Sequence, residues 1–263
     1  MTALSYALDY RQVPHEQYVG SAINVDEIAS GVWRLSISTP QLDFLGSFNY
    51  SCFLIEDEDP LLYHTGKRGF FPILREAIER VMPVSRIKYI SFAHGEADEC
   101  GAMNYFLEAA PQSVVVTNKL GRMIHLADRA IRMPRVLADG ETLSLGRHTI
   151  KWYDTPHMPH CWESGMIGDL TTRTLFVGDL FTQIGPCPTP IVTHDFLPET
   201  ETARRKMPYV SDPAGARPIL ERLAADKPEI LAVMHGSSWR GDGQAMLHAL
   251  ADAWTPEARR GLR

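Results

Sequence analysis

Residues 90–99, with the sequence ISFAHGEADE, place one imidazole and three carboxylates directly after an apolar run. The four side chains belong to His94, Glu96, Asp98 and Glu99. Buried charges are costly unless they are paired or bind a metal, and imidazole together with carboxylate suits iron, zinc or manganese. The stretch therefore predicts either a metal-binding loop at the end of a buried strand or a solvated acidic loop.

Three further polar groups follow apolar, strand-like runs. His157 and His160 come after IKWYDTP, Asp179 comes after TLFVG, and His235 comes after ILAVM. Binding sites gather where several strands end and loops begin. One polar strand end is more often structural than functional, but four in the same topological position favour a shared dinuclear metal site. The two oxygens of a carboxylate can bridge two ions, and Asp179 is the natural bridging candidate.

Composition narrows the function classes. The chain has 263 residues and a net charge of −6 with no basic run, which argues against a nucleic-acid surface. No apolar stretch reaches the ~18–20 residues of a membrane span, and the N-terminal residues do not resemble a secretory signal. A reduced, cytoplasmic setting fits the four scattered cysteines better than a disulfide framework does. These cysteines are Cys52, Cys100, Cys161 and Cys187.

The strand and helix patterns repeat in two halves, with strands first and helices after them. Strands are expected at 21–28, 31–39, 50–57, 60–66, 87–94, 113–118, 148–156, 165–179 as a pair, and 229–236. Helices are expected at 70–82, 99–110, 119–131, 212–228 and 243–254, with an irregular segment at 184–212. We expect Asp98 to be the N-cap of the helix at 99–110. The pattern predicts an α/β fold in which two sheets pack face to face with helices outside, as one domain over 20–263 after an N-terminal arm at 1–19.

At these residues the chain resembles the metallo-β-lactamase fold, an αβ/βα four-layer sandwich. Within that superfamily it most resembles the diiron domain of flavodiiron proteins and the standalone oxygen-binding diiron proteins. The resemblance runs over roughly residues 20–255 and is carried by His94-x-Glu96-x-Asp98-Glu99-x-Gly101, His160-x-x-x-Ser164, Asp179 in FVGD, and His235-Gly236. Glu96 is the discriminating residue, because hydrolytic members usually have histidine there and diiron members have glutamate.

The resemblance implies a set of iron ligands. His94, Glu96 and His160 would bind the first iron, Asp98 and His235 the second, and Asp179 would bridge them. His160 is preferred to His157 because Ser164 follows it by four residues, which leaves His157 as a possible outer residue of the site. Cys100 and Cys161 each neighbour a proposed ligand, and we expect them to be small buried residues rather than ligands.

Two positions depart from the family pattern. Glu99 stands where the family usually has histidine; it can ligate iron or accept a hydrogen bond from bound water. We expect this extra carboxylate to favour the ferric state and lower the reduction potential. His64 stands where many members have a structural aspartate, and we expect it to take that structural role or to approach the site.

The first function hypothesis is a non-haem protein with two iron ions that binds, senses or reduces dioxygen or nitric oxide. The expected absence of a flavodoxin domain after the last helix would then require an external electron donor. The alternative is a dinuclear zinc or iron hydrolase acting on an ester, lactone or thioester, with manganese as a further metal candidate. A metal-poor interaction module is the third reading. Glu96 and Glu99 favour iron, since zinc prefers nitrogen and sulfur ligands. A homodimer is expected from the resemblance.

Overall fold

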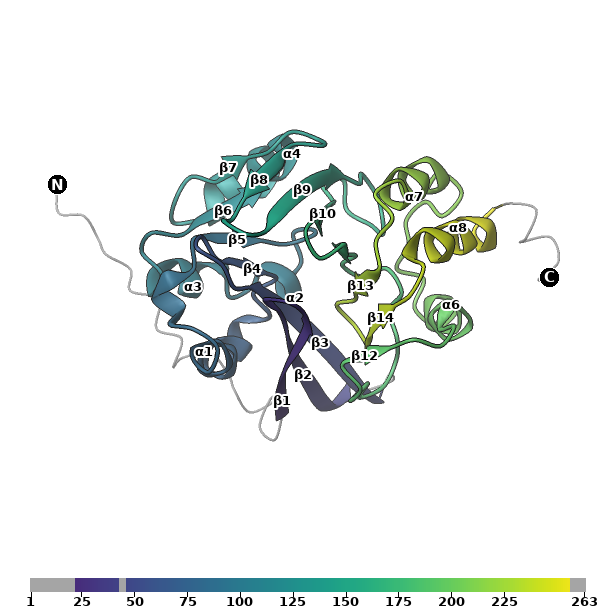
Figure 1. Ribbon diagram of the computed structural model, residues 1–263, viewed down its shortest axis with the longest axis horizontal. Helices are drawn as coiled ribbons and strands as arrows, with labels where there is room; N and C mark the ends of the chain where they lie inside the picture. The colour runs from purple at the N-terminus through teal and green to yellow at the C-terminus, as the bar shows by residue number, and fades with distance from the viewer. Residues whose placement is uncertain (1–21, 43–45, 256–263) are drawn as a thin grey trace.

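The computed structural model describes residues 22–42 and 46–255, so the predicted arm at 1–19 lies outside the described residues. Two seven-stranded sheets form the centre of the molecule, with helices on both sides (Figure 1). The first sheet has the order β1-β2-β3-β4-β5-β6-β7, and the second has the order β12-β14-β13-β11-β10-β9-β8. The expected α/β fold with two mixed sheets is confirmed.

The strands of the first sheet are β1 (Ala22–Ala29), β2 (Val32–Leu42), β3 (Gly46–Ile55), β4 (Leu61–Tyr63), β5 (Tyr89–Ser91), β6 (Val114–Thr117) and β7 (Arg135–Val136). Those of the second are β8 (Thr142–Ser144), β9 (Thr149–Asp154), β10 (Gly165–Asp169), β11 (Thr174–Phe176), β12 (Ile191–Val192), β13 (Ile230–Ala232) and β14 (Ser238–Arg240). In the first sheet β1 to β4 pair antiparallel, and β4 to β7 pair parallel.

The α-helices are α1 (Phe71–Glu79), α2 (Ala97–Cys100), α3 (Met103–Ala109), α4 (Lys119–Gly121), α5 (Ala127–Arg129), α6 (Leu197–Lys206), α7 (Arg217–Ala224) and α8 (Gly243–Ala253). Short 3-10 turns form η4 (Arg68–Phe70) and η5 (Val84–Arg86), and a π-helical turn forms η6 (Arg122–Leu126). Among these described residues no helix is both long and apolar enough to cross a bilayer.

Alternation along the strands explains the layers. On β3, Phe53 and Ile55 point into the core between the two sheets, while Cys52 and Leu54 point into the core beneath α1 and α3. On β9, Trp152 lies in the central core, and Tyr153 belongs to the core beneath α7 and α8. Successive side chains of a strand face opposite ways, so each sheet contributes side chains to two hydrophobic cores. The order of layers is therefore helix, sheet, sheet, helix.

Four loops that follow strands lie at one edge of the sandwich. Strand β11 runs parallel to β13, and β9 runs in the same direction as β11 because both are antiparallel to β10. His160, Asp179 and His235 follow the carboxyl ends of β9, β11 and β13 in turn, and His94 follows β5 of the other sheet. The predicted convergence of polar strand ends is therefore a property of the topology.

Two local expectations are wrong. The helix near 99 begins at Ala97, so Glu96 is its N-cap and Asp98 lies in its first turn. Residues 184–212 contain β12 and helix α6, which buries Thr200, Glu201 and Ala203 instead of an apolar stripe. Glu201 accepts a hydrogen bond from Trp254 Nε1 at 2.7 Å. A helix held by polar tertiary contacts has no apolar period in its sequence.

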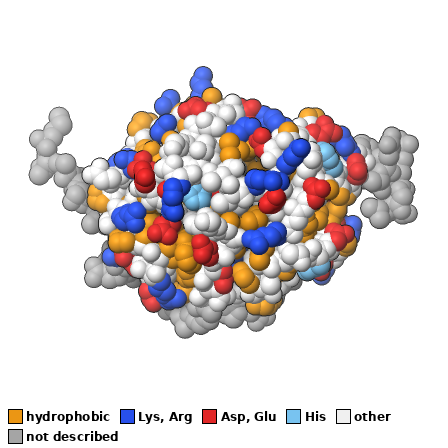
Figure 2. Space-filling view, in the orientation of Figure 1, with side chains coloured by type: hydrophobic (Ala, Val, Ile, Leu, Met, Phe, Trp, Pro, Cys, Tyr) orange, Lys and Arg blue, Asp and Glu red, His pale blue; other side chains and the backbone are white. Residues whose placement is uncertain are grey.

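On the face that Figure 2 shows, acidic and basic side chains are interspersed without a basic patch. This mixture agrees with the small net charge of −6.

Candidate metal centre

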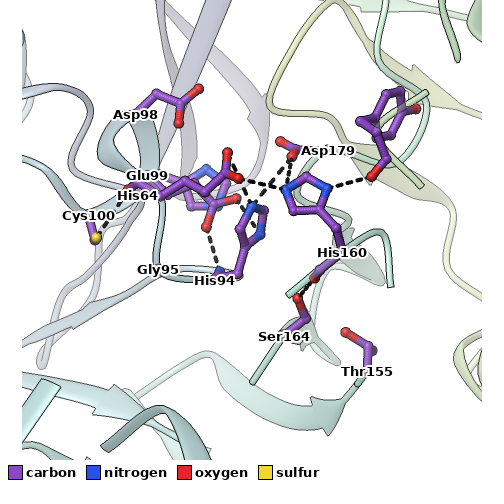
Figure 3. Close-up of polar contacts among 12 residues, drawn as sticks. His64, His94, Gly95, Asp98, Glu99, Cys100, Thr155, His160, Ser164 and Asp179 are labelled. Atoms are coloured by element: carbon purple, nitrogen blue, oxygen red, sulfur yellow. Dashed lines mark hydrogen bonds and ion pairs between the residues drawn. The ribbon is translucent and has the colours of Figure 1, made fainter. Parts of the chain in front are cut away.

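The loop after β5 brings His94 and Glu96 to residues from the second sheet. His94 Nε2 lies 3.7 Å from Glu96 Oε2 and 3.5 Å from Asp179 Oδ2. His160 Nε2 lies 3.1 Å from Glu96 Oε1 and 3.5 Å from Asp179 Oδ2. Figure 3 shows the side chains of His94, His160 and Asp179 pointing toward one another. Two imidazole nitrogens and two carboxylates thus face one small volume, which we call the first position.

Asp98 and His235 form a second group on the other side of Asp179. His235 Nε2 lies 3.2 Å from Asp179 Oδ1 and 3.6 Å from Asp98 Oδ2. Asp179 therefore turns one oxygen to the histidines of the first position and the other to His235. We call the space among Asp98, Asp179 and His235 the second position.

Backbone carbonyls orient two of the three histidines. His160 Nδ1 donates to Tyr209 O at 2.8 Å, and His235 Nδ1 donates to Asn49 O at 2.8 Å. A carbonyl oxygen can only accept, so the proton of each neutral ring is on Nδ1 and the lone pair is on Nε2. Both rings consequently present a metal-binding nitrogen to the shared carboxylates.

Unsatisfied buried atoms test whether this cluster suits a metal. Nε2 of His94, Nε2 of His160 and Oδ1 of Asp179 are buried without a hydrogen-bond partner. Buried polar groups are almost always satisfied, and a cation among these atoms would satisfy them. The donors are imidazole nitrogen and carboxylate oxygen, which is the set expected for iron, zinc or manganese. The residues present therefore fit a metal pair.

Charge in the cluster raises the pKa of the histidines. Burial disfavours protonation of His94, but the neighbouring carboxylates, Glu99 foremost, outweigh it and raise the pKa of His94 to about 10. Burial is likewise outweighed at His235, where Asp179 helps to raise the pKa to about 9. The imidazoles of His160 and His94 lower the pKa of Glu96 to about 2. Without metal, the cluster therefore holds protons where a cation would sit.

A pocket of about 350 Å³ opens onto the cluster. The residues that line it include the apolar Phe48 and Met207 and the carboxylates Glu96 and Asp179. The Phe48 ring lies 4.6 Å from the His235 ring, centroid to centroid. A pocket of this size admits a small molecule to the metal-facing atoms.

The remaining predicted residues lie at different distances from this pocket. His64 is fully buried, with Nε2 3.5 Å from Glu99 Oε1, and Glu99 itself lies behind His94. His157 is exposed on a turn with a φ of 62°, and no contact among the described residues joins its side chain to the cluster. Cys100 is buried, whereas Cys161 is only half-buried. The Cys161 thiol lies within 4.8 Å of ligand atoms of His94, Glu96 and His160.

Sequence reasoning missed the residues that orient the histidines. Tyr209 and Asn49 act through their backbone carbonyls, so their side-chain types carry no signal. Ser164, noted for its spacing from His160, donates its hydroxyl to the His160 carbonyl. It holds the loop that carries the ligand rather than the metal-facing atoms.

The sequence of this chain matches a known protein family. The model of the family described as "ODP family beta lactamase" matches residues 48–236, which include every candidate ligand. This chain belongs to the ODP family. A curated relative, the rubredoxin-oxygen oxidoreductase of Megalodesulfovibrio gigas, is 31% identical over 140 residues, covering 51% of this chain and 34% of the relative.

Solved structures share the fold of this ODP-family chain. The rubredoxin oxygen:oxidoreductase structure from Desulfovibrio gigas superposes with a TM-score of 0.76 at 25% identity, covering 88% of this chain and 61% of that one. The flavodiiron core of Flv1 from Synechocystis sp. PCC6803 also has a TM-score of 0.76, at 20% identity, covering 89% of this chain and 61% of that one. The chain thus has the flavodiiron core fold, and it aligns with about a third of the curated relative.

Proposed function

We propose that this protein holds two iron ions at the first and second positions and binds or reduces dioxygen or nitric oxide there. The observation that carries the proposal is the placement of Asp179, whose two oxygens face histidines of both positions at 3.2 to 3.5 Å. Glu96 adds a carboxylate to the first position, which favours iron over zinc. The name of the rubredoxin-oxygen oxidoreductase supports oxygen as the ligand class.

When bound, the iron pair would supply the electrons and open coordination sites that a diatomic gas needs. The chain's own residues would hold the ions, with His94, Glu96 and His160 at the first position and Asp98 and His235 at the second. The Tyr209 and Asn49 carbonyls keep Nε2 facing inward. Phe48 and Met207 restrict water at the pocket wall. Repeated reduction of the gas consumes electrons, which we propose come from a separate redox protein.

The test begins with metal-free protein loaded with Fe²⁺ under anaerobic conditions. We expect about two irons per chain and a new visible absorption band when oxygen enters. Recovery of the starting spectrum under vacuum would indicate reversible binding, and recovery only after a reductant is added would indicate reduction. A double variant, Asp179→Asn with His160→Gln, is the control and should not bind two irons. Retention of two zinc ions in place of iron, with turnover of a model ester, would refute the proposal in favour of a hydrolase.

A further inference from the structure

The Glu99 carboxylate is bound to the back of His94. Glu99 Oε2 accepts a hydrogen bond from the His94 backbone N–H at 2.6 Å. Glu99 Oε1 lies 3.2 Å from His94 Nδ1, whereas the other ring nitrogen, Nε2, is the one near Glu96 and Asp179. The side chain of Glu99 is 1% exposed, so water cannot compete for these contacts. Both oxygens of Glu99 are therefore directed at one residue.

The turn after β4 holds Glu99 from the opposite side. Thr65 donates its backbone N–H and its hydroxyl to the Glu99 carbonyl, at 2.6 and 3.0 Å. His64 Nε2 lies 3.5 Å from Glu99 Oε1. One of these two facing atoms must carry a proton, since otherwise two lone pairs would oppose each other in a dry interior. The His64 ring is itself packed on the Tyr63 ring, with centroids 4.3 Å apart.

The three histidines of the metal centre differ in the group that faces Nδ1. His160 and His235 each have a backbone carbonyl as the acceptor for Nδ1. Among the described residues, the acceptor group that faces Nδ1 of His94 is the Glu99 carboxylate, 3.2 Å away. We propose that Glu99, closed in by His64, is a positioning residue that fixes the tautomer and direction of His94 and does not bind metal. The proposal rests on the metal pair proposed above, because it assigns a role toward that pair.

The assignment makes the two positions unequal. The first position has four protein ligands, which are His94, Glu96, His160 and Asp179. The second position has three, Asp98, His235 and the shared Asp179. Fewer protein ligands mean weaker binding, so the chain should fill in two separate steps, with the first position ahead of the second. If residue 99 directed a carboxylate or an imidazole at the second position, the two positions would have equal numbers of protein ligands.

A single-position protein isolates the effect of Glu99. The double variant Asp98→Ala with His235→Gln keeps only the first position, and Co²⁺ binding to it can be measured by competition with a chromophoric chelator. Adding Glu99→Ala to this background should weaken Co²⁺ binding by about 10 to 100-fold, the usual effect of removing an outer hydrogen-bond partner of a ligand histidine. Adding Glu99→Gln, which keeps an acceptor for Nδ1–H, should recover part of that loss. If Glu99 were a ligand of the second position, Glu99→Ala would leave Co²⁺ binding to this background unchanged.

Two further variants make the result specific. Glu108→Gln removes an exposed carboxylate from α3 and should leave Co²⁺ affinity unchanged. His64→Asn should weaken binding in the same direction as Glu99→Ala, and the two effects should not add, because the residues act as one unit. Circular dichroism of the metal-free variants checks that each is folded, and Glu99→Gln carries the comparison if Glu99→Ala is not.

The outcomes separate this inference from the proposed function. If the single-position protein binds Co²⁺ equally well before and after Glu99→Gln or Glu99→Ala is added, the positioning role is overturned and the metal centre still stands. A full-length chain that binds no Co²⁺ at all refutes the metal centre itself. A single, unresolved binding step for two ions in the wild type, with equal affinities, would contradict the predicted inequality of the two positions.

Discussion

Metal binding at this cluster should expel protons. In the metal-free protein the pKa of His94 is about 10 and that of His235 is about 9. At pH 7 His235 is then about 99% protonated and His94 more so, whereas both must lose their Nε2 protons to bind a cation. We therefore expect the release of at least two protons when both positions fill.

The cost of this displacement follows from the same values. The pKa of His235 lies about two units above pH 7, so removing its proton costs about 3 kcal/mol; the pKa of His94 lies about three units above pH 7, so removing its proton costs about 4 kcal/mol. Both rings are buried, so solvent does not screen the effect. With two protons displaced, the overall constant for binding two ions should fall about 100-fold for each unit that the pH drops between roughly 8.5 and 6.5.

Calorimetry can count these protons directly. Co²⁺ is titrated into metal-free protein at pH 7 in buffers with different enthalpies of ionisation, and the dependence of the observed heat on the buffer gives the number of protons released. His235→Gln should lower that number by about one. His148→Gln changes a buried histidine that pairs with Asp169 and not with the cluster, so it should not change that number. Release of fewer than one proton by the wild type would refute the reasoning, because the histidines would then be neutral before metal arrives.

Three other perturbations test the fold and the site. Gly165→Ala would place a Cβ 2.1 Å from Cζ2 of the buried Trp152 ring. We therefore expect the free energy of unfolding, measured by urea denaturation, to fall by about 1–3 kcal/mol, with no change in its dependence on urea concentration. The hydrogen bond to Asp169 raises the pKa of His148, so its stabilisation is complete below the unfolded pKa of about 6.5 and is lost as pH rises through the folded pKa. His148→Gln should therefore lower the free energy of unfolding more at pH 6 than at pH 9, and an equal loss at both would contradict this. Glu96→His replaces the carboxylate 3.1 Å from His160 Nε2 with an imidazole and should shift the Zn²⁺ over Fe²⁺ preference upward by about tenfold or ~1.4 kcal/mol, measured by metal analysis after competition.

Much of the architecture could be predicted from the sequence because its causes are local. Apolar alternation in β3 and helical spacing in α1 reflect which side chains each element buries, and neighbouring residues in the chain record both patterns. The types of the candidate ligands are also local, since His94 and Glu96 follow a strand within a few residues. Helix α6 was not predicted, because its burial depends on the contact between Glu201 and Trp254, which is distant in the sequence.

The sequence by itself determined which side chains are available for chemistry, namely imidazoles and carboxylates at the ends of strands. Only the tertiary structure decided which atoms face one another. Glu99 follows Asp98 directly, yet its carboxylate turns back to His94 and His64 while Asp98 faces His235. Adjacent residues on a helix point about 100° apart, and which direction meets a partner depends on β4 and β13 from other parts of the chain. The direction of a side chain at the site is therefore set by packing, and residue type alone cannot supply it.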